Sequence, residues 1–72
     1  DINLVAVSPD GQKIATCSDD KTIKLWDITS GAKLATFQGH TAAVWAVTFS
    51  PDGRKLVSTS EDSTIKIWHV PQ

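Results

Sequence analysis

The sequence predicts an all-β protein built from short antiparallel strands, and three observations carry this prediction. Runs rich in β-branched and aromatic residues alternate with turns rich in Gly, Pro, Asp and Ser. No window of about a dozen residues has the apolar spacing of an amphipathic helix. The chain also repeats itself with a period of 42 residues, so the structure of one repeat should recur in the other.

The repeat needs no gap. A shift of 42 pairs residues 1–30 with residues 43–72, and 12 of the 30 pairs are identical. Most of the remaining pairs exchange similar residues, such as Ile14 for Leu56 and Asp19 for Glu61. A duplicated strand-and-turn unit therefore explains the whole chain.

Seven strands follow in order, each of about the usual length. Pro9-Asp10-Gly11 joins the first strand to the second, because Pro presets φ, Asp caps the turn and Gly accepts the positive φ that follows. The same turn recurs at residues 51–53, and Thr29-Ser30-Gly31 closes another hairpin. The expected strands are Ile2–Ser8, Lys13–Ser18, Thr22–Ile28, Lys33–Phe37, Val44–Ser50, Lys55–Ser60 and Thr64–Val70.

Composition excludes several classes of protein. The 72 residues carry Lys+Arg 7 and Asp+Glu 8, a net charge of −1, which disfavours nucleic acid and anionic membranes as partners. No apolar run is long enough to span a membrane, and no signal peptide is recognisable. A single cysteine, Cys17, cannot form an internal disulfide, which favours an intracellular protein, cytoplasmic or nuclear.

The motifs resemble those of the WD-repeat β-propeller family. Gly39-His40, the Ser-Pro-Asp-Gly turn, the turn aspartate Asp62 and the closing Trp68 occur in order, with a repeat of about 42 residues. The resemblance implies radial blades, each an antiparallel four-stranded meander. Residues 1–37 would form one full blade, and residues 38–72 would form three strands of a second blade that lacks its outer strand. The chain would then begin inside a repeat and be part of a larger propeller.

The resemblance also implies a buried structural tetrad. In the second repeat its members would be His40, Ser58, Asp62 and Trp68, with Ser60 as an alternative to Ser58. The first repeat retains Thr16, Asp20 and Trp26, and its histidine would fall before Asp1. His40, Ser58 and Asp62 could also be interpreted as base, nucleophile and orienting acid, but a polar network that fixes the blade is the favoured hypothesis.

Candidate partner-binding residues lie near the start of the inner strands. Trp45 pairs with the polar Asn3 in the alignment, so the fold itself does not demand an apolar residue there. It would either anchor a partner or pack against a neighbouring blade. Asp19 and Glu61 precede the turn aspartates and would make the same face acidic. The partner-binding candidates are therefore Trp45, Asp19, Glu61 and Asn3.

Nothing predicts a metal, a cofactor or catalytic residues. Cys17 and His69 have no neighbours at metal-ligand spacing, and the four glycines all lie in turns. The expected function is a non-enzymatic scaffold that presents loops to protein or peptide partners within a multiprotein assembly. The alternative is an RNA-contacting propeller subunit of a ribonucleoprotein complex, with Lys24 and Lys66 on the nucleic acid.

The chain is short for an independent core, because below roughly 70–80 residues a core rarely stabilises a fold by more than about 3–5 kcal/mol. Further blades, from the same chain or from other copies, would cover its open faces. We therefore expect the isolated chain to associate with copies of itself, to aggregate or to be poorly ordered.

Overall fold

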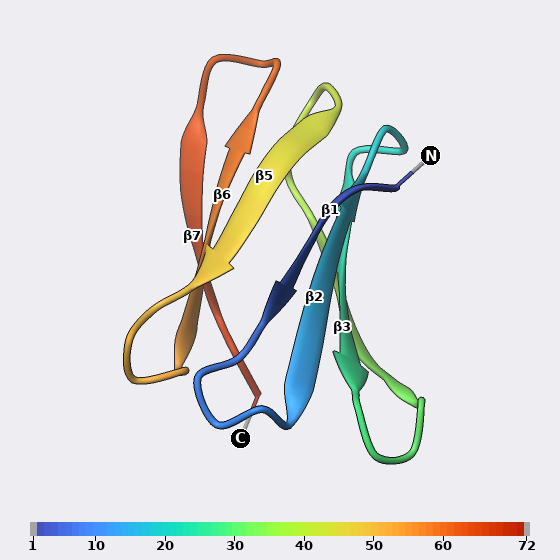
Figure 1. The fold of residues 1–72 in the computed structure, drawn as a ribbon. Coiled ribbons are helices and arrows are strands. Elements are labelled where there is room, and N and C mark those ends of the chain that lie inside the picture. The colour runs from blue at the N-terminus through green and yellow to red at the C-terminus, as the bar shows by residue number, and fades with distance from the viewer. Residues whose placement is uncertain (1, 72) are drawn as a thin grey trace.

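The computed structural model describes residues 2–71, in which seven strands form two antiparallel sheets (Figure 1). The all-β prediction is confirmed, and each strand end lies within one residue of its predicted position. The end residues of the two expected blades, 1 and 72, lie outside the described part. The first sheet has the order β1 (Ile2–Val7), β2 (Lys13–Ser18), β3 (Thr22–Asp27), β4 (Lys33–Gln38), and the second β5 (Val44–Phe49), β6 (Lys55–Ser60), β7 (Ile65–His69).

The Ser-Pro-Asp-Gly turns are built as their residues predict. Gly11 has a φ of 73° and Gly53 a φ of 72°, a region that costs glycine little. The sequence did not reveal the part played by the serine: the Ser8 hydroxyl donates to the Asp10 carboxylate at 2.6 Å and accepts the Lys13 amide at 2.9 Å. Ser50 makes the same pair of bonds, so each turn is a closed local unit.

A second type of turn joins β2 to β3 and β6 to β7. Its third residue has a left-handed backbone although it is not glycine: Lys21 has a φ of 77° and Ser63 a φ of 70°. The aspartate just before it caps the turn, because the Asp20 carboxylate accepts the Thr22 amide at 3.0 Å and Asp62 accepts the Thr64 amide at 2.9 Å.

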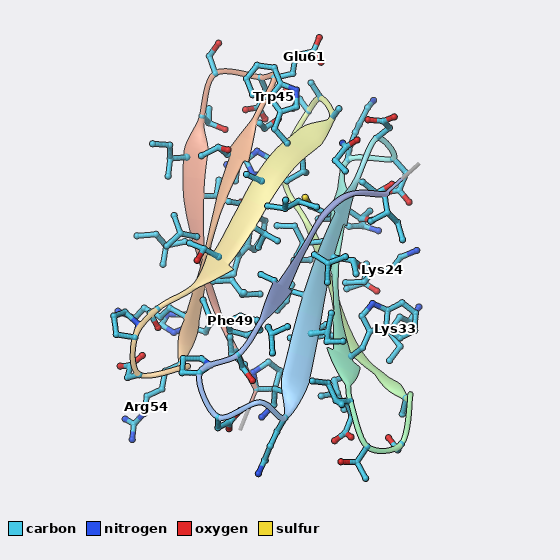
Figure 2. All side chains as sticks on the ribbon, viewed as in Figure 1. Lys24, Lys33, Trp45, Phe49, Arg54 and Glu61 are labelled. Atoms are coloured by element: carbon cyan, nitrogen blue, oxygen red, sulfur yellow. The ribbon has the colours of Figure 1, made fainter. Side chains whose placement is uncertain are left out.

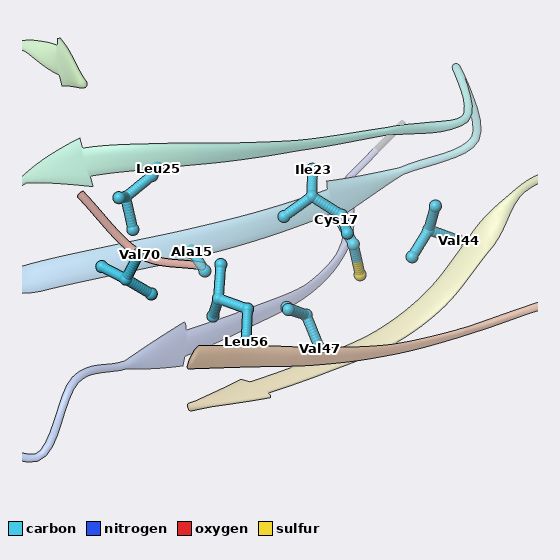
Figure 3. Packing of buried hydrophobic residues seen from close by; sticks show 8 residues of the cluster. All are labelled: Ala15, Cys17, Ile23, Leu25, Val44, Val47, Leu56 and Val70. Atoms are coloured by element: carbon cyan, nitrogen blue, oxygen red, sulfur yellow. The ribbon is translucent and has the colours of Figure 1, made fainter. Parts of the chain in front are cut away.

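The core lies between the two sheets, which face each other, with β1 beside β5 (Figures 1 and 3). Val70, predicted to end the last strand, lies just beyond β7; its side chain is buried and its amide donates to the Arg54 carbonyl at 2.8 Å. The buried apolar residues are Ala15, Cys17, Ile23 and Leu25 from the first sheet, with Val44, Val47, Leu56 and Val70 from the second half.

Among residues 2–71 the structure contains no helix with the length and apolar character needed to cross a membrane.

Candidate functional site

The second repeat contains a continuous hydrogen-bonded network of four side chains. His40 lies just before β5, Ser58 on β6, Asp62 in the β6–β7 turn and Trp68 on β7. The His40 ring lies 3.0 Å from Asp62 through Nδ1 and 2.7 Å from the Ser58 Oγ through Nε2. The Trp68 indole donates to the same Ser58 Oγ at 2.8 Å. The network therefore ties the segment before the inner strand to the second and third strands.

The direction of each bond follows from the chemistry of the partners. An indole N–H can only donate and a carboxylate can only accept, so Trp68 donates to Ser58, and the His40 Nδ1–H donates to Asp62. Ser58 then has its own proton free to donate to the His40 Nε2. Every hydrogen-bond donor of these four side chains that takes part in the network therefore has an acceptor, so the network buries no unpaired polar group.

Asp62 collects more donors than the four-residue pattern contains. The Thr64 hydroxyl donates to one of its oxygens, and the Thr41 amide donates to the other at 2.9 Å. The Thr64 hydroxyl, with the Thr41 amide and His40, holds the pKa of the Asp62 carboxyl well below its usual range. Thr64 was absent from the predicted set, yet the recurrence of Asp-x-Thr, with Asp20 and Thr22 in the first repeat, carried the signal.

Gly39 allows the backbone to pass directly over Trp68. A Cβ added at Gly39 would lie only 2.9 Å from the Cη2 of the Trp68 ring, closer than side chains tolerate. Phe37 on β4 packs against the same indole, with ring centroids 5.5 Å apart. Position 39 therefore requires glycine, because a larger residue would push the backbone away from Trp68 and move His40 out of hydrogen-bond range of the network.

The first repeat has a reduced network. The Trp26 indole donates to the Thr16 hydroxyl at 3.2 Å, and both side chains are only partly buried. Asp20 bonds locally with Thr22, and the pKa of its carboxyl is lowered mainly by that hydroxyl. Ser60, the predicted alternative to Ser58, lies elsewhere: its hydroxyl bonds to the Ala42 and Ala43 carbonyls.

His40, Ser58 and Asp62 have the order of contacts of a base, a nucleophile and an orienting acid. Ser58, however, has no exposed surface, and its oxygen already accepts the Trp68 indole proton. No cavity opens in the part of the chain that the structure describes. A substrate could reach the Ser58 oxygen only if the sheets separated.

The loop end of the molecule carries the partner-binding candidates. Trp45 is 57% exposed and lies at the same end of the molecule as Glu61 (Figure 2), whose amide donates to the Ala43 carbonyl at 3.0 Å. Asp19 is exposed in the β2–β3 turn. Asn3 differs from the others because its amide joins the two sheets, donating to Asp19 at 2.9 Å and to the Val44 carbonyl at 2.8 Å.

The remaining polar side chains offer little chemistry. Cys17 is buried, which raises the pKa of its thiol, and its Sγ lies 3.7 Å from the Leu4 carbonyl. Within residues 2–71 no three His, Cys, Asp or Glu side chains gather as metal ligands would. Lys24 pairs with Asp20 at 3.9 Å, and Lys66 is half-buried.

Comparison with known proteins decides the family. The model of the WD domain, G-beta repeat, matches residues 1–27 and 31–69. The chain belongs to the WD40 repeat family. Both matched stretches end at or just after a network tryptophan, Trp26 and Trp68, so the match covers both repeats of the structure.

Several curated WD40 relatives match most or half of the chain. Periodic tryptophan protein 2 of Arabidopsis thaliana is 47% identical over 49 residues, 68% of this chain and 5% of the relative. Transducin beta-like protein 3 of Bos taurus is 47% identical over 47 residues, which are 65% of this chain and 6% of the relative. Protein TPR3 of Oryza sativa subsp. japonica is 65% identical over 34 residues, which are 47% of this chain and 3% of the relative. The chain thus spans a small fraction of each relative's length.

Proposed function

We propose that this WD40 chain is a non-enzymatic interaction module that binds proteins or peptides through the loop end bearing Trp45. The observation that carries the proposal is the exposed Trp45 indole at the same end of the molecule as the acidic Glu61. Exposed tryptophans are frequent anchors of binding interfaces, because one rigid ring buries a large area at low entropic cost.

The polar network has a structural role in this proposal. It fixes the segment that leads into β5, the strand that carries Trp45, and the β6–β7 turn, which carries Glu61, so a partner would meet a preformed surface. Preformed loops lose little freedom on binding, which leaves more of the contact energy for affinity. Residues 1–37 act as one blade and residues 38–72 as a second blade without its outer strand.

Asp19 and Glu61 at the same end favour a partner with cationic side chains next to an apolar one. Asn3 is the least suited of the four candidates to a partner, because its amide is engaged between the sheets. Trp45 and Glu61 are therefore the central contacts, with Asp19 at the rim. We place this function inside the cell, in the cytoplasm or nucleus, where the free thiol of Cys17 stays reduced.

Selection of short random peptides on the immobilised chain tests the proposal. Enriched peptides should carry Lys or Arg beside an aromatic or aliphatic residue, and Trp45→Ala should weaken their binding at least tenfold. Arg54→Ala, at the opposite end of the molecule (Figure 2), is the matched control and should bind as the parent does. Peptides that bind Trp45→Ala and the parent equally would contradict the proposal.

An RNA-contacting role is the alternative, and the lysines give it little support. Lys24 is paired with Asp20, and half-buried Lys66 lies on the side of β7 that faces the first sheet. If RNA were the partner, Lys24→Glu with Lys66→Glu would lower the affinity and flatten its dependence on salt. Binding unchanged across salt concentrations would reject this alternative.

A further inference from the structure

The first strand of each repeat, β1 or β5, has a β-bulge at the same position. The residue that the strand register omits is Asn3 in β1 and Trp45 in β5. Val44 and Val47 are both buried although they are three residues apart, which the alternation of a regular strand does not allow. A bulge aims one side chain away from that alternation. Asn3 and Trp45 are these side chains, at the end of the molecule where β1 and β5 begin (Figure 1).

The bulge at Asn3 joins the two sheets. The Asn3 Nδ2 donates to the Asp19 carboxylate at 2.9 Å and to the Val44 carbonyl at 2.8 Å. Both partners can only accept, so the amide nitrogen and not the amide oxygen must face them, and both of its protons are used. Asn3 thus connects the β2–β3 turn of the first sheet to the start of β5 in the second sheet.

The Val44 carbonyl belongs to the peptide group that precedes Trp45. The carbonyl one residue earlier, that of Ala43, accepts the Glu61 amide at 3.0 Å. The chain that leads to Trp45 is therefore held from two sides, by Asn3 of the first sheet and by the β6–β7 turn of the second sheet. The bond from Asn3 is the one that relates this segment to the first repeat.

The same bulge position has different uses in the two repeats. In the first repeat the Asn3 side chain is bonded between the sheets, whereas in the second repeat the Trp45 side chain is 57% exposed. One side chain, Asn3, holds both the Asp19 carboxylate and the peptide group before Trp45. The spacing between an anion of the first repeat and an exposed aromatic residue of the second repeat is therefore set by a single amide.

We propose that Asn3 is a positioning residue that makes this end of the molecule one site, on which a single partner segment binds across both repeats. The inference rests on the proposed binding function. A Lys or Arg of the partner lies at Asp19, and its aromatic or aliphatic side chain lies on Trp45, at the spacing that Asn3 sets. Asn3 acts by holding these two contacts in place before the partner arrives, which lowers the ordering cost of binding.

Truncation of Asn3 tests this role, with the Lys-containing peptides that the selection enriches as probes. Asn3→Ala should weaken their binding by about threefold to tenfold, because the freed groups must be ordered again on binding. Gln12→Ala removes an amide side chain from an exposed turn at the opposite end (Figure 1), and this matched control should bind as the parent does. If Asn3→Ala fails to fold by circular dichroism, Asn3→Ser replaces it, because a serine hydroxyl has only one proton for the two acceptors.

A double-mutant cycle separates positioning from general stability. In the parent, Asp19→Asn and a Lys-to-Gln change in the peptide should be coupled: each weakens binding by about fivefold, and both together do little more than one alone. In the Asn3→Ala background the coupling should fall below about twofold, because Asp19 is no longer held at the spacing that the peptide requires. Coupling that is undiminished in that background would overturn the proposal.

Fluorine NMR of the chain labelled with fluorotryptophan measures the same role without a partner. Trp45→Phe removes the Trp45 resonance and so identifies it. Asn3→Ala should shift this resonance and leave those of Trp26 and Trp68 in place, since each of these indoles is bonded within its own repeat. A Trp45 resonance that does not move, or equal shifts of all three, would show that Asn3 does not position Trp45.

The same binding measurements distinguish a failure of this inference from a failure of the proposed function. If Trp45→Ala binds the peptides as the parent does, the proposed binding end is wrong, and the role of Asn3 is wrong with it. If Trp45→Ala weakens binding at least tenfold but folded Asn3→Ala binds as the parent does, this end of the molecule binds partners and only the role of Asn3 is wrong.

Discussion

The two repeats have nearly the same polar residues but bury them differently. In the second, Ser58 is fully buried and bonds with both His40 and Trp68. In the first, the equivalent Thr16 is partly buried and bonds with Trp26 alone. Ser58 faces the first sheet, whereas Thr16 lies on the side of the first sheet that points away from the second. How much a repeated motif contributes to the free energy of unfolding therefore depends on whether a neighbouring sheet buries it.

The largest expected effect comes from removing the central hydroxyl of each network. Ser58→Ala leaves the His40 Nε2 and the Trp68 indole N–H unpaired in a buried place, which should lower the free energy of unfolding by about 2–4 kcal/mol. Thr16→Ala should cost about 0.5–1.5 kcal/mol, because water can replace the lost partner. Urea unfolding followed by tryptophan fluorescence, at one chain concentration, measures both losses. Equal losses would show that burial does not separate the repeats.

The pH dependence of stability should differ between the repeats by less than the effect of removing the central hydroxyl. The folded state lowers the pKa of Asp62 below its ordinary 3.8, so as the pH falls the unfolded chain takes up this proton first. The stability that Asp62 contributes is thus complete above about pH 4 and is lost below it. Asp62→Asn should therefore flatten the loss of stability between about pH 5 and about pH 2.

The matched acid variant is Asp20→Asn. The pKa of Asp20 is also lowered, mainly by Thr22, but it lacks the histidine and the Thr41 amide that Asp62 has. It should flatten the acid slope less than Asp62→Asn does, as urea midpoints across this pH range would show. A steeper acid dependence in either variant than in the parent would contradict the assignment.

The smallest effect is expected to be equal in the two repeats. Lys21→Gly and Ser63→Gly each relieve a left-handed backbone and should stabilise the chain by about 0.5–1 kcal/mol. The turn geometry is local, so thermal unfolding should show similar gains for both variants. A gain in stability in only one repeat would mean that tertiary contacts, and not the local backbone alone, determine the energy of these turns.

Much of the fold was predictable because its signals are local. Turns such as Pro9-Asp10-Gly11 fix the hairpins, and the alternation in strands such as Lys13–Ser18 fixes which side chains share a face. The positions of His40, Ser58, Asp62 and Trp68 were predicted from the family pattern, and the structure brings all four together. Thr64 and Phe37 were missed, since their roles depend on contacts around that network.

The sequence by itself determined the strands, their turns and the two-fold repetition, because these depend on residues a few positions apart and on one visible period of 42. Only the tertiary structure decided which face of each sheet is buried. Ile23 and Ile65 are both isoleucines at equivalent positions of the repeat, yet Ile23 is fully buried and Ile65 is 71% exposed. The physical reason is that burial of apolar area requires a second surface, and a sheet's own sequence does not specify which neighbour lies against it.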